Sequence, residues 1–341
     1  MPRPAPRSPR ERLENLIAAQ PGQRLPSERA LAERFAIGRP ALRLLLADCA
    51  GRGLIHRRHG SGTFAVDPQV PRLARVALII DARIRLGDDP FFAVAVDALQ
   101  HELQACAAQC QLLRHAPGQD PPAPGVVGDG AVLLGSACGE LLAAWPEETA
   151  VVAWLIAAGP SPLGRASLIE LEDEAAGAAA VAYHLAQGCT QLRFVGHDQH
   201  PSPRARLQGA RRAAEAAGIT LALVPSGMNY EDGVAVAAHL VGSGALSQPP
   251  ARLGLIAAND WLAAGLQVGL ARHGHSAGII GFDGLPLAGA LGLSSLAVPI
   301  ATIASDTISE LSRLILRPGL AGRRLSYALR LQPPPAPGRS P

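Results

Sequence analysis

The sequence predicts an α/β protein in which short helices and a β-hairpin precede a long body of parallel β-sheet. Residues 25–66 carry the helical and hairpin patterns, with a glycine-rich tip between two short strands. From Arg75 onward, apolar strands alternate with helical stretches, which predicts parallel sheets flanked by helices. This alternation alone is compatible with one large domain or with two lobes.

Two helices are expected before the first turn. Residues 9–19 repeat apolar positions at helical spacing and predict the first. The second is expected to begin at Ser27, whose hydroxyl suits an N-cap, with the carboxylate of Glu28 at the positive end of the helix dipole. The segment 36–38 then breaks the helical period. Gly38 is expected to make the turn, because glycine tolerates conformations that other residues avoid.

A third helix is expected from Arg39. Pro40 is favourable in a first helical turn, where its missing N–H donor is not needed. Arg39 and Arg43 lie four residues apart on the solvent side. The leucines expected in the core are Leu42, Leu45 and Leu46. Two helices joined this tightly, with arginines opening the second, have the form of a helix-turn-helix.

A basic hairpin is expected after this helix. Gly51 and Gly53 end the helix, and residues 54–58 and 63–66 form the two strands. The residues before and within the tip are Arg57, Arg58, His59, Gly60, Ser61 and Gly62. Such a hairpin makes a wing that can lie along a phosphate backbone.

Positive charge is concentrated in the same part of the chain. The 341 residues have a formal net charge of +3. Up to Val66 there are 12 arginines and 5 acidic residues, a balance of +7, whereas the remainder has 19 basic and 23 acidic residues, a balance of −4. A basic N-terminal segment suits contact with nucleic-acid phosphates.

Residues 25–64, LPSERALAERFAIGRPALRLLLADCAGRGLIHRRHGSGTF, resemble the winged helix-turn-helix of GntR-type transcription regulators. The family's hallmark is a leucine-proline-serine-glutamate opening, a serine-arginine-proline-threonine-valine-arginine turn and a glycine-rich wing. The sequence departs from it at Gly38, where serine is usual, and at Ala41, where threonine is usual. Each feature alone is common in solvated helices and hairpins, and it is their order that makes the resemblance specific.

This resemblance implies that the segment binds a double-stranded DNA operator as a homodimer. Arg39 and Arg43 are expected to contact base edges in the major groove, with guanine as the best partner for a guanidinium. The wing is expected to follow the minor groove or the phosphates. The residues expected to contact DNA are Ser27, Glu28, Arg39, Pro40, Arg43, Arg57, Arg58, His59, Gly60, Ser61 and Gly62.

The predicted organisation is a head at residues 1–66, a proline-bearing linker at 67–74, a body at 75–335 and a tail at 336–341. Strands are expected at residues 76–80, 111–114, 130–134, 150–154, 192–196, 220–224, 253–257 and 277–282. Helices are expected at residues 91–108, 173–187, 204–217, 231–242, 260–273 and 304–315.

Polar and aromatic side chains follow several of these strands. Ligands bind beyond the carboxyl ends of strands in open parallel sheets, so the pattern favours a small polar or polyhydroxylated ligand. Segments including DDPFFAVAVDAL, LGLIAANDWLAAGLQVGLARHG and IIGFDGLPLAGAL resemble, in order, the effector domain of LacI-type repressors, which is similar to periplasmic sugar-binding proteins. This resemblance implies two Rossmann-like lobes joined by three crossovers, with the effector in the cleft.

Six residues match effector-binding positions of that family: Phe91, Phe92, Asp173, Arg206, Asn259 and Asp283. A structural role stays open for several of them. Asp173 and Asn259 can cap helices, and Phe92 can belong to the core.

Together the two resemblances imply a ligand-responsive transcription regulator, with a repressor of sugar or related carbon-source genes as the default. The body alone would also suit a solute-binding protein of a transport system, but the basic head and the lack of a secretion signal argue against that alternative.

The sequence gives little support for an enzyme, a metal-binding protein or a membrane protein. The sequence has no GxSxG, P-loop or HExxH motif, so no enzyme activity, catalytic residue or cofactor is expected. Five cysteines and ten histidines show no metal-ligand spacing, so no metal site is expected. Without a signal sequence or a long apolar run, the protein is expected in the cytoplasm, away from the membrane.

Overall fold

The computed structural model describes residues 8–52, 54–58, 62–66, 73–136, 138–156, 164–246 and 253–333. His59, Gly60 and Ser61 of the expected wing, residues 67–72 of the linker and the tail lie outside the described residues. Within these ranges, no helix combines the length and the low polarity that a membrane span requires.

The head contains the expected three helices and hairpin. Its elements are α1 (Pro9–Ala19), α2 (Glu28–Phe35), α3 (Arg39–Gly51), β1 (Ile55–Arg58) and β2 (Gly62–Ala65). The two strands pair antiparallel, with Arg58 opposite Gly62. Their shared core is Leu13, Leu16, Ile17, Leu25, Leu31, Ala32, Phe35, Leu42, Leu46, Cys49, Ile55 and Ala65. Leu45, expected in this core, packs against it while only partly buried.

The turn between α2 and α3 differs from the prediction at one position. Ala36, not Gly38, adopts the left-handed conformation, with φ 54° and ψ 45°. The left-handed residue is required directly after α2, where its backbone N–H closes the last turn, and Ala36 occupies that position. Gly38 has φ −67° and ψ 149° and is the N-cap of α3. The prediction that Gly38 makes the turn is therefore wrong.

The first lobe is a parallel sheet covered on both faces. Its elements are β3 (Arg75–Asp81), α4 (Pro90–Ala105), β4 (Gln109–His115), α5 (Pro124–Val127), β5 (Gly130–Leu134), α6 (Cys138–Ala143), β6 (Ala150–Trp154), β7 (Ala166–Leu171), α12 (Ile300–Leu316) and β13 (Arg324–Tyr327). The strand order is β13-β7-β6-β5-β3-β4. Leu78 of β3 packs toward α4 and α12, whereas the next residue, Ile79, packs toward α5 and α6. Alternation along each buried strand thus fills two apolar layers.

The second lobe repeats this architecture. Its elements are α7 (Asp173–Ala186), β8 (Gln191–Gly196), α8 (Pro201–Ala216), β9 (Thr220–Pro225), α9 (Tyr230–Gly242), β10 (Leu253–Ala257), α10 (Asp260–Arg272), β11 (Gly278–Asp283), α11 (Pro286–Ala290), β12 (Ser294–Ala297) and β14 (Arg330–Gln332). The strand order is β14-β12-β11-β10-β8-β9, parallel except for β14. Gly177 of α7 lies so close to α8 that a Cβ would overlap the Arg206 carbonyl oxygen. This close approach fixes α8, and with it Arg206, against the start of α7.

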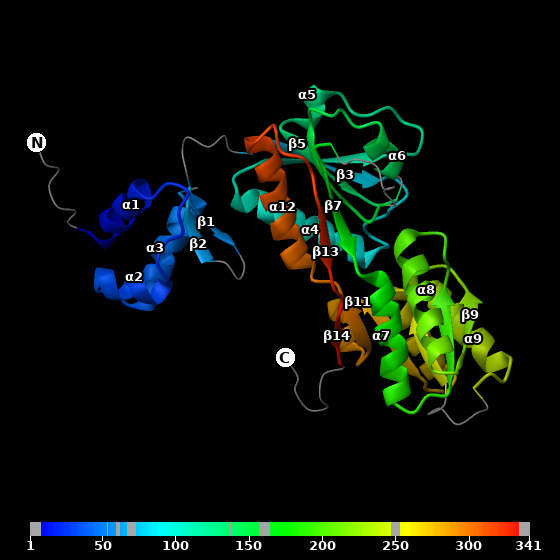
Figure 1. The fold of residues 1–341 in the computed structure, drawn as a ribbon. Helices are drawn as coiled ribbons and strands as arrows, with labels where there is room; N and C mark the ends of the chain where they lie inside the picture. The colour runs from blue at the N-terminus through cyan, green and yellow to red at the C-terminus, as the bar shows by residue number, and fades with distance from the viewer. Residues whose placement is uncertain are drawn as a thin grey trace, which may run out of the picture.

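Three chain crossings join the two lobes, as expected. The chain passes from β7 to α7, returns from β12 to α12, and passes again from β13 to β14 (Figure 1). The returning helix is anchored by a buried hydrogen bond of 2.8 Å from Trp154 Nε1 to Thr307 Oγ1. The strands β7, β12, β13 and β14 were not among the expected elements.

Candidate functional site

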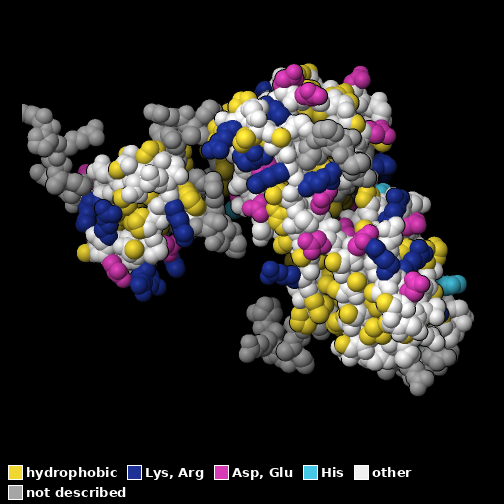
Figure 2. Space-filling view, viewed as in Figure 1, with side chains coloured by type: hydrophobic (Ala, Val, Ile, Leu, Met, Phe, Trp, Pro, Cys, Tyr) yellow, Lys and Arg dark blue, Asp and Glu magenta, His cyan; other side chains and the backbone are white. Residues whose placement is uncertain are grey.

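The head exposes arginines around α3. Arg43 is 67% exposed, and its Nε donates to Glu28 Oε2 on α2 at 3.0 Å. Arg39, the first residue of α3, is also exposed. Figure 2 shows arginine side chains on the visible surface of the head. Because exposed ion pairs contribute little to stability, the Glu28 contact chiefly orients the Arg43 guanidinium on the outer side of α3.

Other residues predicted to contact DNA also have structural roles in the helices and the hairpin of the head. Ser27 is the N-cap of α2, and its hydroxyl accepts a hydrogen bond from the Ala30 N–H at 3.3 Å. Pro40 occupies the first turn of α3. Arg57 and Arg58 lie in β1, and Gly62 opens β2 with φ 113°, a conformation that favours glycine.

The body contains a cavity of about 580 Å³ between the two lobes. Five of the six residues predicted to bind an effector line it: Phe91, Phe92, Arg206, Asn259 and Asp283. Asp173 is not among the lining residues and lies behind Arg206, bonded to it. The remaining lining residues are Asp81, Arg83, Ile84, Arg85, Asp88, Asp89, Gly135, Ser136, Leu155, His197, Gln199, His200, Pro201, Ser202, Pro203 and Met228.

Arg206 is the centre of a buried polar network in the second lobe. Its side chain is only 5% exposed. The Nε donates to Asp173 Oδ1 and the Nη1 to the Ala258 carbonyl oxygen, both at 2.8 Å, and Nη1 lies 3.6 Å from Asp283 Oδ1. The guanidinium also stacks on Phe282, 4.6 Å from the ring centroid. Arg206 is thus held in one orientation before any ligand arrives.

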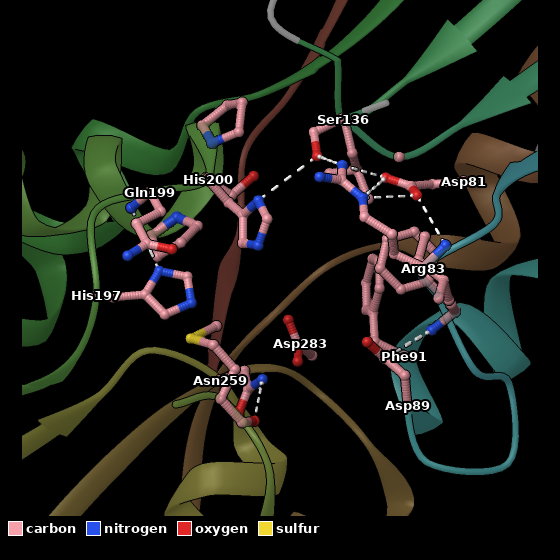
Figure 3. Close-up of a pocket in the computed structure, with 18 of the residues that line it drawn as sticks. Asp81, Arg83, Asp89, Phe91, Ser136, His197, Gln199, His200, Asn259 and Asp283 are labelled. Atoms are coloured by element: carbon pink, nitrogen blue, oxygen red, sulfur yellow. Dashed lines mark hydrogen bonds and ion pairs between the residues drawn. The ribbon is translucent and has the colours of Figure 1, made fainter. Parts of the chain in front are cut away.

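Asp283 is strained and faces the cavity. It ends β11 with φ 116°, which is rare for a residue with a side chain. Burial raises the pKa of its carboxyl well above the usual range; Arg206 opposes this shift, and the charges of Asp260 and Asp89 add to it. In Figure 3, Asp283 and Asn259 face Arg83 and Ser136 across the cavity. The arrangement leaves Asp283 able to exchange hydrogen bonds with a polar ligand.

Asp260 fixes the loop that carries Asp283. Its Oδ1 accepts from Ser295 Oγ at 2.7 Å and its Oδ2 from the Leu285 N–H at 2.8 Å. The neighbouring Asn259 caps α10 by accepting from the Leu262 N–H at 2.8 Å. Asn259 also donates from Nδ2 to the Met228 carbonyl oxygen at 3.0 Å. Asn259 therefore lines the cavity and supports it at the same time.

The pKa of Asp260 predicts a pH-dependent effect of removing its charge. Burial raises this pKa to about 6, although hydrogen bonds from Ser295 and Leu285 lower it. A carboxyl whose pKa is higher in the folded state makes stability fall as pH rises between about 4 and 6. Urea unfolding should therefore show Asp260→Asn gaining stability relative to wild type as the pH rises from 4 to 8. A difference that stays constant with pH would contradict this assignment.

The first lobe contributes a second polar group to the cavity. Arg83 binds both carboxylate oxygens of Asp81, with Nη2 to Oδ2 at 2.6 Å, and also donates to Ser136 Oγ at 3.1 Å. Ser136 Oγ lies 3.5 Å from His200 Nδ1 of the other lobe. Burial lowers the pKa of His200, and the charges of His197 and Arg83 add to this shift. A neutral His200 can exchange a hydrogen bond with Ser136 across the opening.

The aromatic side of the cavity lies at the start of α4. Phe91 and Phe92 meet edge to face, with ring centroids 5.5 Å apart. Asp89 caps this helix by accepting from the Phe92 N–H at 3.3 Å. Both rings also pack against the core of the first lobe, so the core role left open for Phe92 and a cavity role coexist. Among the described residues, no group of three or more metal-ligating side chains converges on one point.

The comparisons with known proteins support both halves separately. The model of the gntR family of bacterial regulatory proteins matches residues 10–65, and that of the periplasmic binding protein-like domain matches residues 181–340. An uncharacterized HTH-type transcriptional regulator of Mycobacterium tuberculosis is 51% identical over 70 residues, 20% of this chain and 28% of that protein. The HTH-type transcriptional repressor NagR of Bacillus subtilis is 43% identical over 51 residues, 15% of this chain and 21% of that protein. The chain thus matches less than a third of the length of these relatives.

Solved structures resemble the body. A LacI family transcriptional regulator from Enterococcus faecium with bound ribose has a TM-score of 0.62 at 22% identity, covering 75% of this chain and 96% of that one. The transcriptional regulator CelR in complex with cellobiose has a TM-score of 0.63 at 18% identity, covering 90% and 98%. At these identities the likeness establishes the fold. The chain therefore combines a head that matches the model of the gntR family of bacterial regulatory proteins with a two-lobed body that has the periplasmic binding protein-like fold.

Proposed function

We propose that this protein is a ligand-responsive transcription regulator, with a DNA-binding head at residues 1–66 and an effector-binding body at residues 75–335. The observation that carries the proposal is the interlobe cavity, with Arg206 and Asp283 fixed in it, on a chain whose head is a helix-turn-helix. The relatives named as transcription regulators support the assignment, and the named repressor makes repression the default.

The proposed mechanism couples the cavity to the spacing of two heads in a homodimer. In each copy, Arg39 and Arg43 contact base edges in the major groove, while Arg57, Arg58 and the wing follow the phosphates or the minor groove. A ligand that contacts both lobes stabilises a closed arrangement of the lobes. The contact between Ser136 Oγ and His200 Nδ1, 3.5 Å apart, joins the two lobes in that arrangement. Closure shifts the population between dimers that match the operator and dimers that do not.

The charges of the cavity favour a neutral, polyhydroxylated ligand. Each arginine that lines it has a carboxylate partner: Arg83 with Asp81, Arg85 with Asp88 at 4.0 Å, and Arg206 with Asp173 and Asp283. An anionic sugar acid or sugar phosphate would therefore meet arginines whose positive charge is already offset by a neighbouring carboxylate. A neutral sugar needs only to exchange hydrogen bonds with them, and sugars are bound in two of the similar structures.

The function is tested by measuring binding of the full chain to DNA from upstream of its own gene. Titrations at several salt concentrations should give a specific complex, whose affinity shifts with a neutral sugar and not with the sugar acid of the same skeleton. If no duplex binds above the non-specific level with any ligand, the regulator proposal fails and the solute-binding alternative returns. Chemical turnover of the bound sugar would instead point to an enzyme.

Asp283→Ala is expected to abolish the response to ligand concentrations that half-saturate wild type, without changing operator affinity. Loss of a hydrogen bond to a charged or strongly polarised group should weaken ligand binding about 10- to 100-fold. Calorimetric titration with the sugar and DNA binding without it measure the two activities separately. Asp198→Ala removes an exposed carboxylate of the same lobe that does not line the cavity, and should keep both activities. Equal loss of both activities in Asp283→Ala would contradict separate modules.

A further inference from the structure

Leu44 is the most exposed large apolar side chain among the described residues, with 74% of its surface accessible. The others of this kind are 38–47% exposed: Val94, Leu112, Val126 and Leu331. Leu44 lies on α3, next to Arg43. An aliphatic side chain this exposed contributes almost no burial to the fold, so its position calls for another explanation.

Two sets of apolar residues lie on opposite sides of α3. One set is fully buried in the head core: Leu42, Leu46 and Cys49. A second set is exposed: Pro40, Leu44 and Ala47. Spacings of four and three residues place this second set in line along the outer side of the helix. The outer side therefore presents a short aliphatic strip with the Arg43 guanidinium beside it.

The composition of α3 restricts which base edges it can distinguish. Its sequence, RPALRLLLADCAG, contains no Asn, Gln, Ser or Thr. Arginine pairs best with guanine, whereas adenine is usually recognised by Asn or Gln. The helix thus lacks the side chains that recognise an A·T pair by bidentate hydrogen bonds. What an A·T pair still offers in the major groove is the C5 methyl group of thymine, which is recognised by apolar contact.

A protein partner suits this strip less well than DNA. The exposed Arg39 and Arg43 adjoin it on the same helix. The carboxylate of Glu28 is already bonded to Arg43, and the carboxylate of Asp48 accepts from Arg10 at 2.8 Å. A second copy packed here would bring further arginines together, whereas DNA phosphates bring the opposite charge.

We propose that Leu44 is a specificity-determining residue that packs on the C5 methyl of a thymine beside the base pair contacted by Arg43. The inference rests on the proposed function, because it requires α3 to enter the major groove. It adds a statement about the operator: each half-site contains a thymine that is recognised through its methyl group alone.

Deoxyuridine tests this contact because it differs from thymidine only by lacking that methyl group. Duplexes that bind the full chain are first selected from random DNA, and each thymine is then replaced singly by deoxyuridine. Affinities are measured for wild type, for Leu44→Ala and for Leu331→Ala, which removes an exposed leucine from β14. At one thymine per half-site, the replacement should weaken wild type and Leu331→Ala about three- to fivefold and leave Leu44→Ala unchanged.

The outcomes separate this inference from the function on which it rests. Failure to select any specific duplex overturns the proposed function and the thymine contact with it. If a specific duplex is selected but every deoxyuridine affects wild type and Leu44→Ala equally, the regulator proposal stands and the thymine contact is wrong. If Leu44→Ala changes the molecular mass in solution and keeps the deoxyuridine effect, Leu44 joins copies of the chain and the inference is overturned.

Discussion

Replacing Arg206 by alanine is expected to destabilise the second lobe by about 3–5 kcal/mol. In wild type its buried guanidinium donates hydrogen bonds to Asp173 and to the Ala258 carbonyl oxygen, and it forms an ion pair with Asp283. Alanine removes the positive charge and the donors that these buried acceptors share, and removing one partner of a buried pair costs far more than the intact pair contributes. Urea unfolding at pH 7, followed by circular dichroism, measures the loss.

Two further variants make this result specific. Arg204→Ala removes an exposed arginine of the same helix, whose guanidinium donates to the backbone oxygens of Asp198 and Gln199, and should cost less than about 1 kcal/mol. Arg206→Lys keeps the positive charge but loses the planar fork, so it should recover part of the stability and little ligand binding. Equal stability of Arg206→Ala and Arg204→Ala would contradict the central role assigned to the buried guanidinium.

The fold was predictable from sequence where a strand is a continuous apolar run. The run from Val76 to Ile80 is apolar throughout and became β3, buried at every one of these residues. The strands β13 (RLSY) and β14 (RLQ) carry arginines and are largely exposed, so no apolar run marks them. They form because β7 and β12 would otherwise have unpaired backbone N–H and C=O groups along one edge. Which strands lie at an edge is known only once the sheets are assembled.

The part of the candidate site that lies at strand ends was also predictable from the sequence. Arg206, Asn259 and Asp283 follow strands or begin helices at the edge where parallel sheets bind ligands, and they do line the cavity. Ser136 and His200 were missed because they meet only across two lobes. Asp81 and Arg83 also line the cavity; Asp81 ends β3, so its strand-end position was the signal that could have found it. The strain at Asp283 could not be foreseen, because aspartate carries no sequence signal for φ 116°.

Arg43→Ala is expected to lower operator affinity by about 1–3 kcal/mol in each half-site. The physical reason is loss of the guanidinium that Glu28 holds at 3.0 Å on the outer side of α3, where it can bind guanine with two hydrogen bonds. Because the lost contact depends on the base, non-specific affinity should fall much less than specific affinity. Filter binding to the selected operator and to unrelated DNA of equal length, at matched salt, gives this ratio directly.

Arg29→Ala is the matched control for the loss of charge. Arg29 is 76% exposed on α2, where its partner Glu33 lies 3.7 Å away, and it is not among the residues expected to contact bases. An exposed arginine that interacts only with the general field of the phosphates should affect specific and non-specific DNA alike. The two variants therefore separate base recognition from charge: Arg43→Ala must reduce the specificity ratio and Arg29→Ala must preserve it. Parallel changes in both would mean that Arg43 contributes charge alone, and base recognition by α3 would have to come from other residues.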